Sequence, residues 1–288
     1  ILTGGTLTKG VTGAGTTSIT GAVTANSAIS QTISISSSGD LTANAGNIGG
    51  AVTNAGDLIL TGGTLSKAVS GAGLTTITGN TTNSAGINQG VKVNSGITLT
   101  NNAALGSASG SVTNAGTINS SADNIKGTVS NTGSLNLSGG TLSKAVSGSG
   151  KTTISGNTTN SGGINQGVTV NSGVTLTNNA ALGSDSGTIT NSGTINTNAS
   201  NIKGTVANNN TLNLSGGTLS KAVSGAGTTN ITGAVTSNSA ISQAINVVAA
   251  GDLTINANNI GGAVTNAGDL ILTGGTLTKG VTGAGTTS

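Results

Sequence analysis

The feature of this sequence that most constrains its fold is an internal repeat. The motif GGTLxK begins at Gly4, Gly62, Gly139, Gly216 and Gly274, with successive spacings of 58, 77, 77 and 58. These spacings complete one superperiod, after which residues 1–18 recur unchanged at 271–288. Periodic sequences of this kind fold by stacking copies of one small unit. We therefore expect residues 1–288 to form one continuous repeat structure, with a superperiod at 16–285, as a window of a longer array.

Turn glycines divide the superperiod into smaller units, whose lengths are 17, 20, 23 or 24. The units between Gly15 and Gly285 close at Gly39, Gly56, Gly73, Gly96, Gly116, Gly133, Gly150, Gly173, Gly193, Asn210, Gly227, Gly251 and Gly268. Asn is the residue that best tolerates positive φ after Gly. We therefore expect each unit to end at a corner in a left-handed backbone conformation.

The eight shortest units share three aliphatic positions. Position 2 and position 9 are always Leu or Ile, and position 13 is always Val. The core candidates at these positions are Leu41, Ile48, Val52, Leu58, Leu65, Val69, Ile125, Val129, Leu142, Val146, Ile202, Val206, Leu219, Val223, Ile260 and Val264. A unit this short cannot bury its aliphatic side chains alone, whereas stacked units can.

These patterns predict an all-β fold, a parallel β-solenoid of about 14–15 stacked coils, each as long as one of the units. No 3.6-residue apolar stripe is present, and Gly and β-branched residues are poor helix formers. The extra residues of longer units should bulge from a corner or lengthen a strand. If neighbouring coils are one strand spacing apart, ~4.8 Å, the fourteen coils of one superperiod form a rod roughly 67 Å long.

The composition supports this interpretation and excludes other classes. The chain has no Phe, Trp, Tyr, Met, Pro, Cys or His, which fits a narrow coil with unbroken strand ladders. Without Cys or His, a disulfide scaffold or a zinc site cannot be built. A net charge of +3 spread over 288 residues does not make a nucleic-acid footprint. No apolar run approaches the ~18 residues of a membrane-spanning helix.

Several turns resemble those of a known class of proteins. Runs such as 52–58 (VTNAGDL), 112–118 (VTNAGTI) and 189–195 (ITNSGTI) resemble the N-x-G-x-I/L turns of large secreted bacterial surface proteins. These are the haemagglutinin-like and autotransporter-type adhesins, whose exported parts are right-handed β-helices. The resemblance implies roles in surface attachment, aggregation and filament building. The strict superperiod and the lack of aromatic residues favour a structural filament or stalk over a ligand-binding adhesin.

Paired carboxylates are the first candidates for chemistry. Asp40 and Asp57 hold position 1 of successive coils, and so do Asp252 and Asp269. Stacking places each pair roughly 4.8 Å apart at the backbone, near the separation used by retaining glycosidases. Carboxylates also bind Ca²⁺, so these four residues are candidate calcium ligands. The simpler interpretation is that Asp after Gly is an exposed turn residue.

Lysines recur at position 11 of four units. They are Lys67, Lys144, Lys221 and Lys279, and each preceding coil carries Gly at that position. Like charges one strand spacing apart repel, so alternation with Gly avoids this cost. We expect a bend near positions 10–11 that turns each lysine into solvent. These charges discourage lateral aggregation or dock a neighbouring rod or an anionic polysaccharide.

The sequence therefore predicts a structural role and not an enzyme, because a catalytic triad or a metal–histidine site cannot be assembled. We expect an extracellular or cell-surface fibre or stalk segment of a giant repetitive bacterial protein, with no cofactor. Its expected partners are copies of itself, end-to-end or lateral, and surface polysaccharide, without nucleic acid or a membrane span. The alternative is an adhesin that binds glycans or surfaces along its polar Asn, Thr and Lys face. Ice binding is disfavoured, because position 3 is too mixed for a uniform Thr array.

Overall fold

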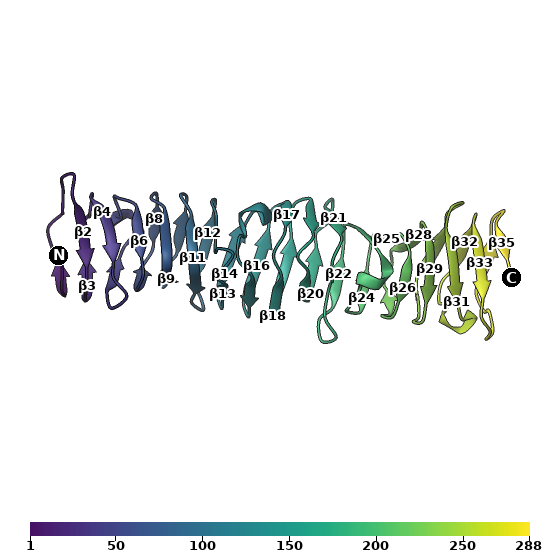
Figure 1. Cartoon of the computed structure of the whole chain (residues 1–288). Helices are drawn as coiled ribbons and strands as arrows, with labels where there is room; N and C mark the ends of the chain where they lie inside the picture. The colour runs from purple at the N-terminus through teal and green to yellow at the C-terminus, as the bar shows by residue number, and fades with distance from the viewer. The chain divides into compact units, whose positions relative to one another are not determined.

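The computed structural model covers residues 1–288 and confirms the β-solenoid. The chain is 52% strand and 4% helix, and its parallel strands stack in about 17 turns. It divides into two compact units, Ile1–Asn136 and Leu137–Ser288, and each is described by itself. Within each unit, successive coils lie side by side with their strands aligned (Figure 1). Strand β16 (Ser134–Leu137) lies at the division.

The first unit has three columns of parallel strands, and each coil adds one strand or one isolated bridge to each column. The first column contains β1 (Gly5–Leu7), β3 (Ala22–Ala25), β5 (Asp40–Ala43), β7 (Asp57–Leu60), the ends of β9 (Val69–Ile77) and β11 (Ile87–Val93), β13 (Val112–Asn114) and β15 (Val129–Asn131). The second contains β2 (Thr16–Ile19), β4 (Thr32–Ile35), β6 (Val52–Asn54) and the beginnings of β9 and β11. The third contains β8 (Gly63–Leu65), β10 (Thr81–Asn83), β12 (Thr98–Asn101) and β14 (Thr117–Ser120).

The second unit repeats this arrangement. One column contains β17 (Gly140–Leu142), β19 (Thr158–Asn160), β21 (Thr175–Asn178), β23 (Thr194–Thr197), β25 (Thr211–Leu214), β28 (Thr228–Ile231), β30 (Ala244–Val247), β32 (Val264–Asn266) and β34 (Val281–Thr282). Another contains β18 (Val146–Ile154), β20 (Ile164–Val170), β22 (Ile189–Asn191), β24 (Val206–Asn208) and β27 (Val223–Ser224). The third contains β26 (Gly217–Leu219), β29 (Ala234–Ser237), β31 (Asp252–Ile255), β33 (Asp269–Leu272) and β35 (Thr286–Thr287).

The only helical elements are four short 3-10 turns at coil corners. They are η1 (Ala45–Asn47), η2 (Ala122–Asn124), η3 (Ala199–Asn201) and η4 (Ala257–Asn259). The side chains of Asn44, Asn198 and Asn256 accept a hydrogen bond from the backbone N–H two residues later and begin three of these turns. Each turn buries its Ala against the interior.

The number of turns is larger than the 14–15 expected from the sequence. The stretch of chain between register partners in neighbouring coils varies, and it is shorter from Ile19 to Ile35 than from Val91 to Val112. Because Thr16 already pairs with Thr32, a long unit such as 16–39 exceeds one turn. As a consequence, strands from equivalent GGTL motifs do not stack in one column: β1 lies in the first column and β8 in the third.

The extra residues of the longer units have both of the expected fates. Strands are lengthened to seven residues in β11 and β20, which lie within longer units. Strands β9 and β18 reach nine residues because each continues from one of the shortest units into the longer unit that follows it. Five-residue loops also occur at 106–110 and 183–187, where Ser107 and Gly110 exchange backbone hydrogen bonds and Ser184 pairs with Gly187 in an antiparallel bridge. Long strands and loops thus accommodate the insertions without interrupting the stacking.

Candidate functional site

The aliphatic residues predicted for the core line the interior. Each of the sixteen has a relative exposure of 2% or less. Leu41 stacks on Leu58 and Val52 on Val69, as the shortest units require. In the following coil the register partner of an aliphatic residue is polar in some columns: Leu58 lies beside Thr75, and Leu65 lies beside Asn83. The interior is therefore not purely aliphatic.

The expectation of left-handed corners is wrong for most of the corner residues. Gly96 and Gly173 have a φ of 75°, but the other corner glycines do not have positive φ, and neither does Asn210. Close stacking explains the glycines instead. A Cβ built on Gly56 would collide with the carbonyl oxygens of Gly39 and Ser36. Asn210 is an exposed residue of its coil, and its Nδ2 donates a hydrogen bond of 3.3 Å to the carbonyl oxygen of Ser192.

The lysines lie on the outside of the coil. Lys67 and Lys279 are exposed, and Lys144 and Lys221 are half-buried. The strand is interrupted at this point, since β8 ends at Leu65 and β9 begins at Val69. The chain bends between these strands and directs the lysine away from the interior, as expected from the alternation with Gly.

Lys221 has a partner that the sequence did not indicate. Its Nζ donates a hydrogen bond of 2.5 Å to Oδ1 of Asp185. The Lys221 ammonium holds the pKa of the Asp185 carboxyl below its ordinary value, through this hydrogen bond and through Coulomb attraction. Asp185 is at the tip of the 183–187 loop, and the loop at 106–110 has Ala108 at the corresponding place. The ion pair therefore ties one loop of the second unit to a bend two coils further along the chain.

The aspartate pairs are register partners on the outer surface. Asp40 lies beside Asp57 in β5 and β7, and Asp252 beside Asp269 in β31 and β33. All four side chains are exposed. No cluster of three or more Asp, Glu, His or Cys side chains occurs around either pair. The residues on either side of the first pair are Ala22 and Leu74, neither of which supplies an oxygen ligand from its side chain.

Buried asparagines form hydrogen-bonded ladders that sequence reasoning missed. Asn191 Nδ2 donates to Asn208 Oδ1 over 2.7 Å, and Asn191 Oδ1 accepts from the N–H of Gly193 over 3.1 Å. The same side-chain bond joins Asn83 to Asn101, Asn114 to Asn131 and Asn160 to Asn178, at 2.6–2.7 Å. All of these asparagines are at most 2% exposed. Each pair places one amide above another, so that the interior polar groups satisfy one another.

Buried glutamines make a related contact with threonine. Gln89 Nε2 donates to Thr75 Oγ1 over 2.8 Å, and Gln243 Nε2 donates to Thr229 Oγ1 over 2.7 Å. Gln166 and Thr152 form the same pair at 2.7 Å. The recurrence of the pair in both units shows that it belongs to the repeat.

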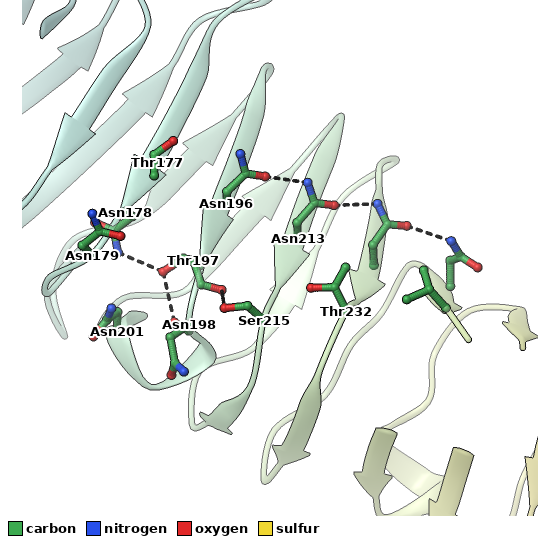
Figure 2. A pocket seen from close by; sticks show the side chains of 13 residues that line it. Thr177, Asn178, Asn179, Asn196, Thr197, Asn198, Asn201, Asn213, Ser215 and Thr232 are labelled. Carbon is green, nitrogen blue, oxygen red and sulfur yellow. Dashed lines mark hydrogen bonds between the residues drawn. The ribbon is translucent and has the colours of Figure 1, made fainter. Parts of the chain in front are cut away.

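A second kind of asparagine ladder lies on the outside of the second unit. Asn213 Nδ2 donates to Asn196 Oδ1 over 2.6 Å, Asn230 Nδ2 to Asn213 Oδ1 over 2.7 Å, and Asn246 Nδ2 to Asn230 Oδ1 over 3.2 Å. The four residues are register partners on β23, β25, β28 and β30. We call them the outer amide ladder; Figure 2 shows its hydrogen bonds running in one direction from coil to coil.

The outer amide ladder lines a groove of about 710 Å³. A second row of side chains forms the other side of the groove and includes Asn198, Ser215 and Thr232, which directly follow the ends of β23, β25 and β28 (Figure 2). Successive coils contribute, and the lining is Thr177, Asn178, Asn179, Asn196, Thr197, Asn198, Asn201, Asn213, Ser215, Asn230, Thr232, Asn246 and Val248. None of these residues carries a charge, and Val248 alone is apolar. The groove is therefore neutral, and the side chains that line it are polar with the exception of Val248, although their methyl and methylene groups also face the groove.

Comparison with known proteins adds no relative. No family model, no curated protein and no solved structure matches the chain. No helix of the chain is long and apolar enough to span a membrane.

Proposed function

We propose that this chain is a structural element, a segment of an extracellular fibre or stalk of a giant repetitive bacterial surface protein. The observation that supports the proposal is the coil-to-coil continuity within each unit. Strands, aliphatic columns and buried amides all pair along the coil axis. Contacts between neighbouring coils add up along one direction, as in other solenoid proteins, and an extended fibre needs stability that is built in this way.

The identity of residues 1–18 and 271–288 supports the same role. Coils with the same sequence present the same stacking surface, so successive superperiods keep the same contacts. Polar Thr, Ser and Asn side chains on the outer surface keep such a fibre hydrated, and the partners of this chain are further copies of the repeat.

The proposal is tested on native material. Antibodies against the chain should label the surface of intact source cells, and aligned filaments should give a diffraction spacing of about 4.8 Å along the fibre axis. Labelling confined to the cell interior, or an axial spacing near that of helices, would contradict it. When a purified chain is pulled from its ends, it should unfold at a distinct force. A chain that extends as easily as an unstructured linker, without an unfolding event, would contradict the mechanical part of the proposal.

A further inference from the structure

The outer amide ladder is preorganised for a ligand. Each asparagine amide has two N–H donors and two acceptor lone pairs. The ladder uses one donor and one lone pair of Asn213 and of Asn230. One N–H and one lone pair of each amide therefore remain for a molecule in the groove, and their directions are fixed by the neighbouring rungs.

A comparison of two copies of the repeat shows that the outer amide ladder is longer in the second unit, at Asn230 and Asn246, than at the equivalent place in the first unit. Residues 216–279 align without gaps to residues 4–67 and differ from them at 14 positions. Asn230, Asn246 and Val248 stand where the first copy has serine, at positions 18, 34 and 36, and all three line the groove. The serines at 18 and 34 are register partners in the first unit, but serine is too short to join neighbouring strands as asparagine does. The changes turn a row of hydroxyls into two further rungs of the amide ladder.

The charge and spacing of the groove decide between classes of ligand. No lysine or aspartate lines it, so it offers an ionic ligand no counter-charge. Equivalent groups recur at one strand spacing, ~4.8 Å, whereas an extended peptide presents same-side groups about 6.8 Å apart. The sugar rings of a linear polysaccharide follow one another at an interval close to the strand spacing. Alternate rings of a β-1,4-linked chain are turned over, but every ring carries hydroxyls on both of its edges, and these both donate and accept.

We propose that this groove binds a neutral, linear polysaccharide lying along the coil axis, with the outer amide ladder hydrogen-bonded to hydroxyls of successive rings. Because each further sugar ring can hydrogen-bond to a further amide of the ladder, the affinity should increase with the length of the glycan. The inference goes beyond the scaffold role and does not rest on it, because a fibre without this groove would keep its strand pairing and its buried contacts between coils.

The test uses the full chain and titration calorimetry with cellohexaose and mannohexaose as neutral probes, their disaccharides as short probes, and an alginate hexasaccharide as a charged probe. We expect at least one neutral hexasaccharide to bind in the millimolar range and its disaccharide to bind about tenfold more weakly. The variant Asn230→Ser/Asn246→Ser restores the residues of the first copy, and it should weaken binding of the hexasaccharide about tenfold. Circular dichroism shows whether the fold is kept.

A matched control removes an outward asparagine outside the groove. Asn119→Ser breaks the exposed bond from Asn136 Nδ2 to Asn119 Oδ1, 2.7 Å long, in the first unit, and it should leave glycan binding unchanged. Equal binding by the groove variant and the native chain would overturn the proposal. So would the absence of binding to both neutral probes at about 10 mM, or a preference for alginate. A groove variant that changes self-association in sedimentation, with no change in glycan binding, would assign the groove to a second copy instead.

Discussion

At the scale of single residues, the interior of this protein depends on polar side chains that are paired with one another. Asn191 is fully buried, and its amide makes hydrogen bonds with Asn208, Thr211 and the backbone of Gly193. Burying an amide costs free energy unless its donors and acceptors are satisfied. The ladder supplies these partners from the neighbouring coil, so a chain without aromatic residues fills its interior with amides as well as aliphatic side chains.

Removal of one buried rung should therefore be costly. We expect Asn191→Ala to lower the free energy of unfolding by about 1–3 kcal/mol, because Asn208 and the Gly193 N–H lose a buried partner. Urea unfolding followed by circular dichroism measures the change. Asn119→Ala, which removes an exposed amide, should change stability by about 0.5 kcal/mol or less. Equal effects of the two substitutions would show that the ladder is not a source of stability.

The corner glycines make a second prediction at this scale. Gly56→Ala should destabilise the fold by about 1–3 kcal/mol or more, since the added methyl group pushes against the carbonyl oxygens of Gly39 and Ser36. A Cβ at Gly280 meets no atom within 4 Å, so Gly280→Ala is the matched control and should be tolerated. Neither glycine has positive φ, so a lower melting temperature of Gly56→Ala than of Gly280→Ala reports steric contact, and equal melting temperatures would contradict the close-stacking explanation.

At the scale of elements, the sequence predicts the strands better than it predicts their partners. Leu41, Val52 and Leu58 were identified from position alone, because an aliphatic residue at a fixed position has only the interior to occupy. Asparagines such as Asn191 were interpreted as turn residues, since N-x-G is also the composition of a turn. The recurrence of asparagine one coil further along the chain, as at 191 and 208, was the available signal for the ladder. The Asp185–Lys221 pair had no such signal, because its residues are two coils apart.

The Asp185–Lys221 pair makes a prediction about pH. Lys221 lowers the pKa of the Asp185 carboxyl, so the pair is intact above the ordinary carboxyl pKa and is lost as the pH falls through the lowered value in the folded chain. Carboxyl resonances followed by NMR should show that Lys221→Ala raises the pKa of Asp185 towards its ordinary value. High salt should have the same direction of effect, because both groups are accessible to solvent, with side-chain exposures of 31% for Lys221 and 90% for Asp185. An unchanged Asp185 pKa in Lys221→Ala would mean that the pair does not persist in solution.

At the scale of the whole molecule, stability should be distributed along the coils and not concentrated in one centre. Apart from the exposed Asp185–Lys221 pair, each coil makes the contacts described above with the coil before and the coil after it, so energetic coupling decays with the number of coils between two residues. A substitution in one coil should then weaken its neighbours most. This behaviour distinguishes a solenoid from a globular domain, in which one core unfolds as a unit.

Hydrogen exchange measures this decay within the second unit. Ile164 is fully buried, and Val146 and Leu182 are its register partners in the neighbouring coils. Ile164→Ala should cost about 2–5 kcal/mol locally and reduce amide protection in β18, β20 and the strand residues beside them. Protection around Leu253, several coils away, should fall much less. Thr265→Ala, an exposed change, serves as the control and should leave both regions unchanged. A uniform loss of protection from β18 to β33 would show that the unit unfolds as one cooperative body, so that stacking contacts alone do not describe its energetics.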